Sequence, residues 1–209
     1  ITEVSKKHGA YIMVDEAHSL GVLGENGRGL SEAEGVEADV DFIVGTFSKS
    51  VGSIGGFCTS NHEELDTVRL ALRSYIFTAS LRPSIVAAAS VTLERIKNEP
   101  ALRQRLWANT DLVYDGLMDL GFDIGPHRSP VIGVFMPSLK QGLQAWQMLM
   151  DEGVYVNMVL PPPAPENTCL LRCSVSAAHT EQQISIILNA FSQLKAWLYP
   201  SATPNSAAK

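Results

Sequence analysis

The sequence predicts an α/β fold that continues into a smaller α+β region. Residues 10–14 form a continuous apolar run, residues 40–45 are apolar apart from Asp41, and polar residues bound both stretches. Such runs are typical of strands buried on both faces of a parallel sheet. From Pro83 onward the apolar residues recur at helical spacing instead. Hydrophobic residues make up 45% of the 209 positions and charged residues 18%, which favours a packed core over disorder.

The first part of the chain opens on ITEVSKKHG, which has the pattern of a helix end. Lys6, Lys7 and His8 suit a helix C-terminus, and Gly9 suits its cap. A helix entered without a start signal indicates that the chain is a fragment of a longer protein.

The remaining elements of the first part follow from short patterns. SEAE at Ser31–Glu34 is a candidate capping box. Residues 56–60 are expected to form a third strand, and SNHEELDTVRLALRS a helix. The strands of this part are expected to be parallel.

The second part alternates helices and strands. Helices are predicted over 84–98, 101–120 with Gly121 as a cap, and 141–152, and strands over 131–136, 154–157 and 169–175. Thr180 and Gln183 form a capping box that begins a last helix, to about Leu198. We expect a large domain over 1–93, a small α+β domain over 94–198 and a flexible tail over 199–209.

Composition excludes several classes of protein. The net charge is -6 and no block of Lys and Arg occurs, which argues against a nucleic-acid surface. No apolar run reaches membrane-spanning length and no signal peptide is present. The three cysteines fit neither a metal spacing nor a disulfide framework, which indicates buried thiols in a reducing, cytoplasmic compartment and no metal site. Cys169 and Cys173 would share one face of a strand and serve packing.

The candidate chemistry lies where two expected strands end. Ligands of open α/β sheets bind at the carboxyl ends of strands, and there the sequence offers Asp15, His18 and Lys49. A lysine amine among small residues suits a Schiff base with an aldehyde, and pyridoxal 5'-phosphate fits this arrangement. Asp15 would keep the cofactor's ring nitrogen protonated. Thr46, Ser48 and the glycine-rich loop after them offer hydroxyls and amides to its phosphate.

Simpler interpretations exist for each residue alone. Lys49 flanked by serines and glycines also fits a solvated loop lysine, Asp15 a cap of the next turn, and His18 a loop histidine with its own partners. The glycine loop matches neither a dinucleotide-binding nor a phosphate-loop motif, since Lys49 precedes the glycines. The combination at two strand ends favours a site.

Four motifs carry a resemblance to a known family. VDEAHSLGVLGENGRG, GTFSKSVGSIGGF, YIFTASLRPS and LLRCSVSAAHT resemble the α-oxoamine synthases, which are fold-type-I pyridoxal-phosphate enzymes. These enzymes join an amino acid to an acyl-CoA with loss of carbon dioxide. The motifs GTFSKSVGSIGGF, SYIFTASLRPS and VYVNM are most similar to the bacterial serine palmitoyltransferases. The resemblance implies the C-terminal part of such a fold, a small amino acid such as serine and an acyl-CoA as substrates, and a homodimer in the cytoplasm.

The resemblance also implies residue roles. Lys49 matches the Schiff-base lysine that also removes the Cα proton, Asp15 the partner of the ring nitrogen, and His18 the histidine that bonds the ring oxygen of the cofactor. Together these would be the catalytic residues.

Further residues match positions that bind phosphate or substrate. Thr46 and Ser48 match phosphate-side hydroxyls, and Thr78 a residue that reaches the phosphate across the subunit interface. Arg172 matches the arginine that binds the substrate carboxylate. Two departures from the family stand out. The resemblance implies that the family's N-terminal half, which carries part of the cofactor and acyl-CoA site, is absent, so this chain alone is not expected to complete an active site. Leu160 occupies a place where close relatives in the family have an arginine that assists substrate binding.

Three alternatives stay open from sequence. An oxononanoate synthase or another member of the family would use a different amino acid and acyl donor. An inactive regulatory partner subunit would bind an active one, although such subunits typically lack the lysine. A simple binding module would only hold a phosphate ligand.

Overall fold

The computed structural model describes residues 1–164, 166 and 168–200. The chain divides into two compact units, Ile1–Arg103 and Gln104–Lys209. The division into domains at residue 93 stays a prediction. Of the predicted flexible tail, residues 201–209 lie outside the described residues.

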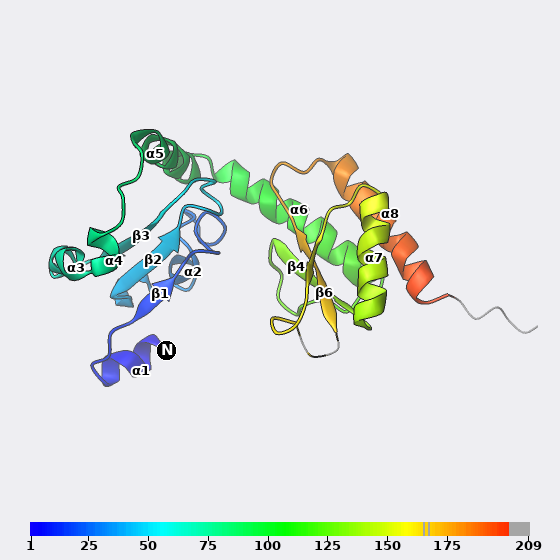
Figure 1. The fold of residues 1–209 in the computed structure, drawn as a ribbon, viewed down its shortest axis with the longest axis horizontal. Helices are drawn as coiled ribbons and strands as arrows, with labels where there is room; N and C mark the ends of the chain where they lie inside the picture. Colours follow the sequence, from blue (N-terminus) through cyan, green and yellow to red (C-terminus); the bar gives the residue numbers. More distant parts are fainter. Residues whose placement is uncertain (165, 167, 201–209) are drawn as a thin grey trace, which may run out of the picture. The chain divides into compact units, whose positions relative to one another are not determined.

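The first unit is built around a three-stranded sheet of order β1-β2-β3 (Figure 1). Its elements are α1 (Thr2–Lys7), β1 (Met13–Asp15), α2 (Leu30–Ala33), the 3-10 turn η1 (Glu37–Asp39), β2 (Phe42–Thr46), β3 (Gly56–Ser60), α3 (Leu65–Ala71), α4 (Arg73–Ile76) and α5 (Pro83–Asn98). The helix α6 (Pro100–Asp119) leads into the second unit.

The second unit has a sheet of order β4-β6-β5 in which both pairings are antiparallel. Its further elements are β4 (Val131–Met136), α7 (Leu139–Asp151), β5 (Asn157–Val159), β6 (Cys169–Ser174) and α8 (Glu181–Leu198). The mixed α/β architecture agrees with the fold class that the sequence predicts.

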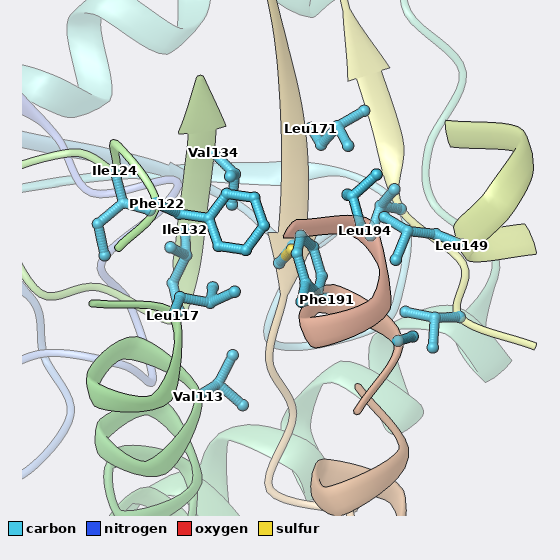
Figure 2. Close-up of a cluster of buried hydrophobic side chains, with 14 of the residues drawn as sticks. Val113, Leu117, Phe122, Ile124, Ile132, Val134, Leu149, Leu171, Phe191 and Leu194 are labelled. Atoms are coloured by element: carbon cyan, nitrogen blue, oxygen red, sulfur yellow. The ribbon is translucent and has the colours of Figure 1, made fainter. Parts of the chain in front are cut away.

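Alternating burial along β4 and β6 gives the second unit its core. Ile132, Val134 and Met136 of β4 are buried while the residues between them are not. The same holds for Cys169, Leu171 and Cys173 of β6. The predicted burial of the cysteines is therefore right for Cys169 and Cys173 and wrong for Cys58, which is exposed on the short strand β3. Figure 2 shows this face packed against side chains of α6, α7 and α8, which include Leu117, Leu149, Phe191 and Leu194. Leu170 and Arg172 lie on the opposite face of β6 and are only half-buried.

Helix ends follow the predicted capping signals in several places. Gly121 has φ +73 and closes α6, with the amide of Phe122 bonded to the carbonyl of Leu117 over 3.1 Å. Thr180 and Gln183 form the reciprocal capping box at the start of α8. These two helix ends could be predicted from the sequence because the hydrogen-bonded residues of each cap lie within one or two helical turns of each other.

The predicted parallel arrangement of the first part is only half right. β1 and β2 are parallel, but β2 and β3 are antiparallel. Nine residues, 47–55, connect β2 to β3, and a parallel crossover needs a dozen or more. The predicted burial on both faces is wrong for β1, where Met13 is 64% exposed. β2 is half-buried along its whole length, because the described helices of this unit cover the sheet only in part.

Three local predictions also differ from the structure. Ser31–Glu34 forms no capping box, since α2 starts after Gly29 and the Ser31 hydroxyl donates to Glu16 instead. The helix expected over 60–74 is broken at Leu72, which has an extended backbone. The strand expected over 154–157 begins only at residue 157. Val154 and Val156 before it are buried and hydrogen-bonded to α7, through the Leu149 carbonyl and the Trp146 side chain.

Candidate active site

The carboxyl ends of β1 and β2 lie side by side. Asp15 is the last residue of β1 and pairs with Val44 of β2. The ladder extends one residue further, because the Glu16 amide donates to the Val44 carbonyl over 2.8 Å. Paired residues of parallel strands share a face and side chains alternate along a strand, so Asp15 and Thr46 lie on the same face of the sheet. This adjacency agrees with the strand-end site that the sequence predicts.

Asp15 and His18 both remain accessible. Asp15 Oδ1 accepts the Ala17 amide over 2.8 Å, which fixes the side chain at the start of the turn. Its second oxygen has no protein partner among the described residues. His18 is exposed, and in the described part of the chain its ring makes no hydrogen bond. Both groups therefore keep lone pairs or N–H groups for a ligand.

The loop after β2 is fixed by its own backbone. The Phe47 amide donates to Gly55 O over 2.9 Å and the Ser53 amide to Phe47 O over 2.7 Å. The Thr46 hydroxyl lies 2.7 Å from the Ser48 hydroxyl and 3.1 Å from Gly55 O. Thr46 and Ser48 thus sit at the entry of an ordered loop, with the Ser48 hydroxyl exposed.

Lys49 lies near the start of this loop, one residue after Ser48. Its side chain is exposed, while Val51, two residues on, is buried and anchors the loop. Within the described residues the Lys49 amine has no hydrogen-bond or ion-pair partner. An exposed and unpaired amine is available for covalent or ionic contact with a ligand.

The two strand-end loops touch each other. A Cβ placed on Gly21, in the loop that follows β1, would lie 3.0 Å from Ser50 Cβ. Gly21 has φ +77, so glycine serves both the turn and the close approach. The loop that carries His18 therefore packs directly beside the residue that follows Lys49.

Thr78 lies outside the two loops that carry His18 and Lys49. It follows α4, is exposed, and donates its hydroxyl to the Ser74 carbonyl of the same turn. Among the described residues, Thr78 makes no hydrogen bond to the loop of Lys49. Its role across a subunit interface stays a prediction.

Arg172 belongs to the second unit. It lies in the central strand β6 between Gly133 of β4 and Asn157 of β5. It is half-buried, lines a cavity of about 550 Å³, and has no hydrogen-bond or ion-pair partner among the described residues. Its partner on β4, Gly133, carries no side chain, and a Cβ there would meet Leu170 Cδ1 at 3.9 Å. An unpaired guanidinium in a cavity suits a carboxylate, which accepts two parallel hydrogen bonds from it.

Sequence reasoning missed Glu16, which is fully buried beside Asp15. Burial raises the pKa of this carboxyl, but hydrogen bonds from Ser19, Ser31 and the amide of Leu30 outweigh that effect and hold the pKa below its usual value. No local pattern in the sequence indicated that Glu16 is a buried, ionised acceptor of hydrogen bonds, because two of its partners, Leu30 and Ser31, lie 14 and 15 residues further on.

The buried cysteines are not candidates for reactive groups, although Cys173 lines the same cavity as Arg172. Burial raises the pKa of the Cys173 thiol to about 12 and also raises that of Cys169. Since the thiolate is the reactive form, both residues serve packing. In the described residues no group of His, Cys, Asp and Glu side chains could hold a metal ion.

Comparison with known proteins decides the family. The model of the family described as aminotransferase class I and II matches residues 1–191. The chain belongs to this family. A relative from Caulobacter vibrioides named serine palmitoyltransferase is 50% identical over 198 residues, which are 95% of this chain and 49% of the relative. A relative from Pelobacter propionicus named 8-amino-7-oxononanoate synthase is 36% identical over 187 residues, 88% of this chain and 48% of that one.

Solved structures of the family agree with the fold. A structure described as serine palmitoyltransferase with bound PLP has a TM-score of 0.91 and 47% identity, and covers 94% of this chain and 50% of that one. The chain thus spans about half the length of the relatives it matches. Among the described residues, none of the helices has both the length and the apolar character that crossing a membrane requires.

Proposed function

We propose that the protein to which this chain belongs is a pyridoxal-phosphate-dependent acyltransferase. It joins a small amino acid, serine in the first instance, to an acyl-CoA with loss of carbon dioxide. The observation that carries the proposal is the 50% identity, across nearly the whole chain, to a relative named serine palmitoyltransferase. A solved neighbour that is 47% identical and holds PLP supports the cofactor.

The side chains of the first unit fit this cofactor. An unpaired amine at Lys49 suits its aldehyde, and the free oxygen of Asp15 on the neighbouring strand suits its ring nitrogen. The Thr46 and Ser48 hydroxyls, 2.7 Å apart, suit its phosphate. When bound, pyridoxal phosphate supplies an electron sink for a carbanion at the Cα of the amino acid.

Each residue then has a defined task. Lys49 would hold the cofactor through Nζ, and once the substrate's own amine has displaced it, the freed Nζ would accept the Cα proton. Asp15 keeps the ring nitrogen protonated through a charge-assisted hydrogen bond, which makes the ring a stronger electron acceptor. His18 donates to the ring oxygen and orients the substrate.

Arg172 orients the amino acid through its carboxylate. Its guanidinium is free of partners among the described residues and lines a cavity, so no described ion pair has to break before substrate binds. A bidentate arginine–carboxylate pair fixes both position and direction. We further propose a cytoplasmic homodimer in which Thr78 contacts the cofactor phosphate of the partner subunit.

The second candidate is an 8-amino-7-oxononanoate synthase-like reaction with another amino acid and acyl donor. Two observations favour weighing it: the 36% identity to a relative of that name, and the exposed Leu160, at a position where the sequence resemblance leads one to expect an arginine. Product analysis of the full-length protein with serine, glycine and alanine against a series of acyl-CoAs separates the two. A product from serine and a long-chain acyl-CoA supports the first.

The cofactor assignment is tested on the full-length protein by borohydride reduction and peptide mapping. We expect the pyridoxyl label on Lys49 and loss of both the label and product formation in Lys49→Ala. Lys97→Ala, which removes an exposed lysine of α5, is the matched control and retains both. Label on another residue, or normal turnover by Lys49→Ala, contradicts the assignment of Lys49. A wild-type protein that takes up no label and forms no product contradicts the proposed function and leaves a binding module or a regulatory subunit.

A further inference from the structure

Glu16 is the only fully buried carboxylate among the described residues. It is fully buried, and its oxygens accept four hydrogen bonds. Oε2 accepts the Leu30 amide over 2.7 Å and the Ser19 hydroxyl. Oε1 accepts the Ser31 amide over 2.8 Å and the Ser31 hydroxyl. A buried carboxylate with all its lone pairs used is a rigid anchor.

The anchored backbone is the segment that carries the site residues. Glu16 follows Asp15 directly, and its amide continues the β1–β2 ladder to Val44. Its carbonyl accepts the amides of Ser19 and Leu20 over 3.1 and 2.9 Å, which closes the turn that carries His18. One residue thus ties the strand, the turn and the start of α2 together.

Gly29 shows that the surrounding chain is built around this carboxylate. A Cβ at Gly29 would lie 2.5 Å from Glu16 Cδ, and the residue has φ +122. Only glycine adopts that backbone without strain. The loop between the turn and α2 also presses Gly21 against Ser50, next to Lys49.

We propose that Glu16 is a positioning residue that fixes Asp15 and His18 relative to the loop of Lys49. The proposal rests on the proposed function, since it assigns a purpose to the geometry of those three residues. Glu16 touches none of the ligand-facing atoms itself. It acts through the backbone between Asp15 and Leu20 and through the loop that reaches Ser50.

The chain offers a matched control in Glu32. Its carboxylate is also largely buried and accepts hydrogen bonds from the Asn26 amide, the Asn26 side chain and the Arg28 amide. These bonds stay within residues 26–32 and do not reach the turn after β1. Glu16→Gln and Glu32→Gln are therefore the same chemical change in the same loop with different connections.

The test compares both variants of the full-length protein in two forms. In the cofactor-free form, hydrogen exchange of the amides in 17–20 is expected to be faster in Glu16→Gln and unchanged in Glu32→Gln. In the cofactor-loaded form, Glu16→Gln is expected to shift the pH titration of the cofactor's visible absorption band and to lower kcat with little change in KM. A loss of about 10- to 100-fold in kcat is the range seen when partners that orient metal ligands are removed. Glu32→Gln is expected to leave the titration unchanged even where it lowers the melting temperature.

A milder variant covers the case in which Glu16→Gln fails to fold. Ser31→Ala removes one donor of the four and is expected to change exchange and titration in the same direction by less. The proposal is overturned if Glu16→Gln and Ser31→Ala both show the hydrogen exchange and the titration of the wild-type protein. It is also overturned if Glu32→Gln changes these two measurements as much as Glu16→Gln does. If the wild-type protein shows no cofactor absorption, the proposed function fails, while the exchange comparison still reports on Glu16.

Discussion

The Gly29→Ala variant tests the packing around Glu16 in energetic terms. A Cβ at position 29 would lie 2.5 Å from Glu16 Cδ, whereas carbon atoms prefer about 3.5–4.0 Å. The carboxylate has to retreat by about 1 Å to restore that contact. Its hydrogen bonds to the amides of Leu30 and Ser31, now 2.7 and 2.8 Å, then exceed the limit of about 3.2 Å for N–H···O bonds.

The expected cost has two parts. Hydrogen bonds to charged groups contribute about 1.5–3 kcal/mol each, and two of them weaken together. The backbone at φ +122 adds about 1–3 kcal/mol of strain for a residue with a Cβ. Allowing for relaxation of the loop, we expect Gly29→Ala to lower the free energy of unfolding by about 3–6 kcal/mol.

Gly35 provides the control in the same region. It has φ +67, and a Cβ there would meet nothing within 4 Å. Gly35→Ala is therefore expected to cost only the left-handed backbone term of about 1–2 kcal/mol. Denaturant unfolding of the full-length variants, followed by fluorescence and by hydrogen exchange of residues 30 and 31, compares the two. Equal destabilisation by both variants, with protected amides at 30 and 31, would refute the reasoning.

Four further results are expected. The Cβ introduced by Gly142→Ala would overlap the Cys169 Sγ, so this variant should lower the free energy of unfolding by about 1–3 kcal/mol. Denaturant unfolding of the double variant with Cys169→Ala should show that most of this loss is recovered. Arg172→Lys keeps the charge but loses the planar fork, so steady-state kinetics should show a raised KM for the amino acid more than a lowered kcat. Native thiol labelling with peptide mapping should leave Cys169 and Cys173 unmodified, since both are buried and the pKa of Cys173 is raised to about 12. The pKa of Glu16 is lower in the folded protein than in the unfolded chain. Its ionised form therefore stabilises the fold above the unfolded pKa, and this stabilisation is lost as the pH falls through the folded pKa. The melting temperature should consequently fall less steeply with decreasing pH in Glu16→Gln than in the wild-type protein.

Local patterns predicted those elements whose signal lies within a few residues. The strand Val131–Met136 has the predicted bounds because its flanking residues break the pattern on both sides. The cap at Thr180 was found because the hydrogen-bond partner is Gln183, three residues away. Such features depend little on the rest of the fold.

Predictions failed where an apolar run had two possible uses. Val154 and Val156 are as buried as a central strand, yet they precede β5 and contact the end of α7, where the Trp146 side chain donates to the Val156 carbonyl over 3.0 Å. Hydrophobicity reports burial and does not identify the partner. The direction of β3 was similarly undetermined by its residues and is set by the short connection from β2.

The site was predictable to the extent that it follows from strand ends. The parallel pairing of β1 and β2 places Asp15 beside the strand that leads to Lys49, as the sequence pattern indicated. Glu16 was not predictable in the same way, since its partners at Leu30 and Ser31 are brought to it by the fold. A residue that acts across a loop leaves no periodic signal in the sequence.

Asp15 and Glu16 show how two neighbouring carboxylates divide their tasks by environment. A carboxylate offers about four lone-pair positions. Glu16 uses them within the protein, with four hydrogen bonds and no exposure, so it has none left for a ligand. Asp15 accepts one described hydrogen bond, from Ala17, and is exposed, so its second oxygen is available. Exchanging the two roles would require exchanging the partners of both, which is why a single substitution at Glu16 is expected to disturb the position of Asp15 and not to replace its chemistry.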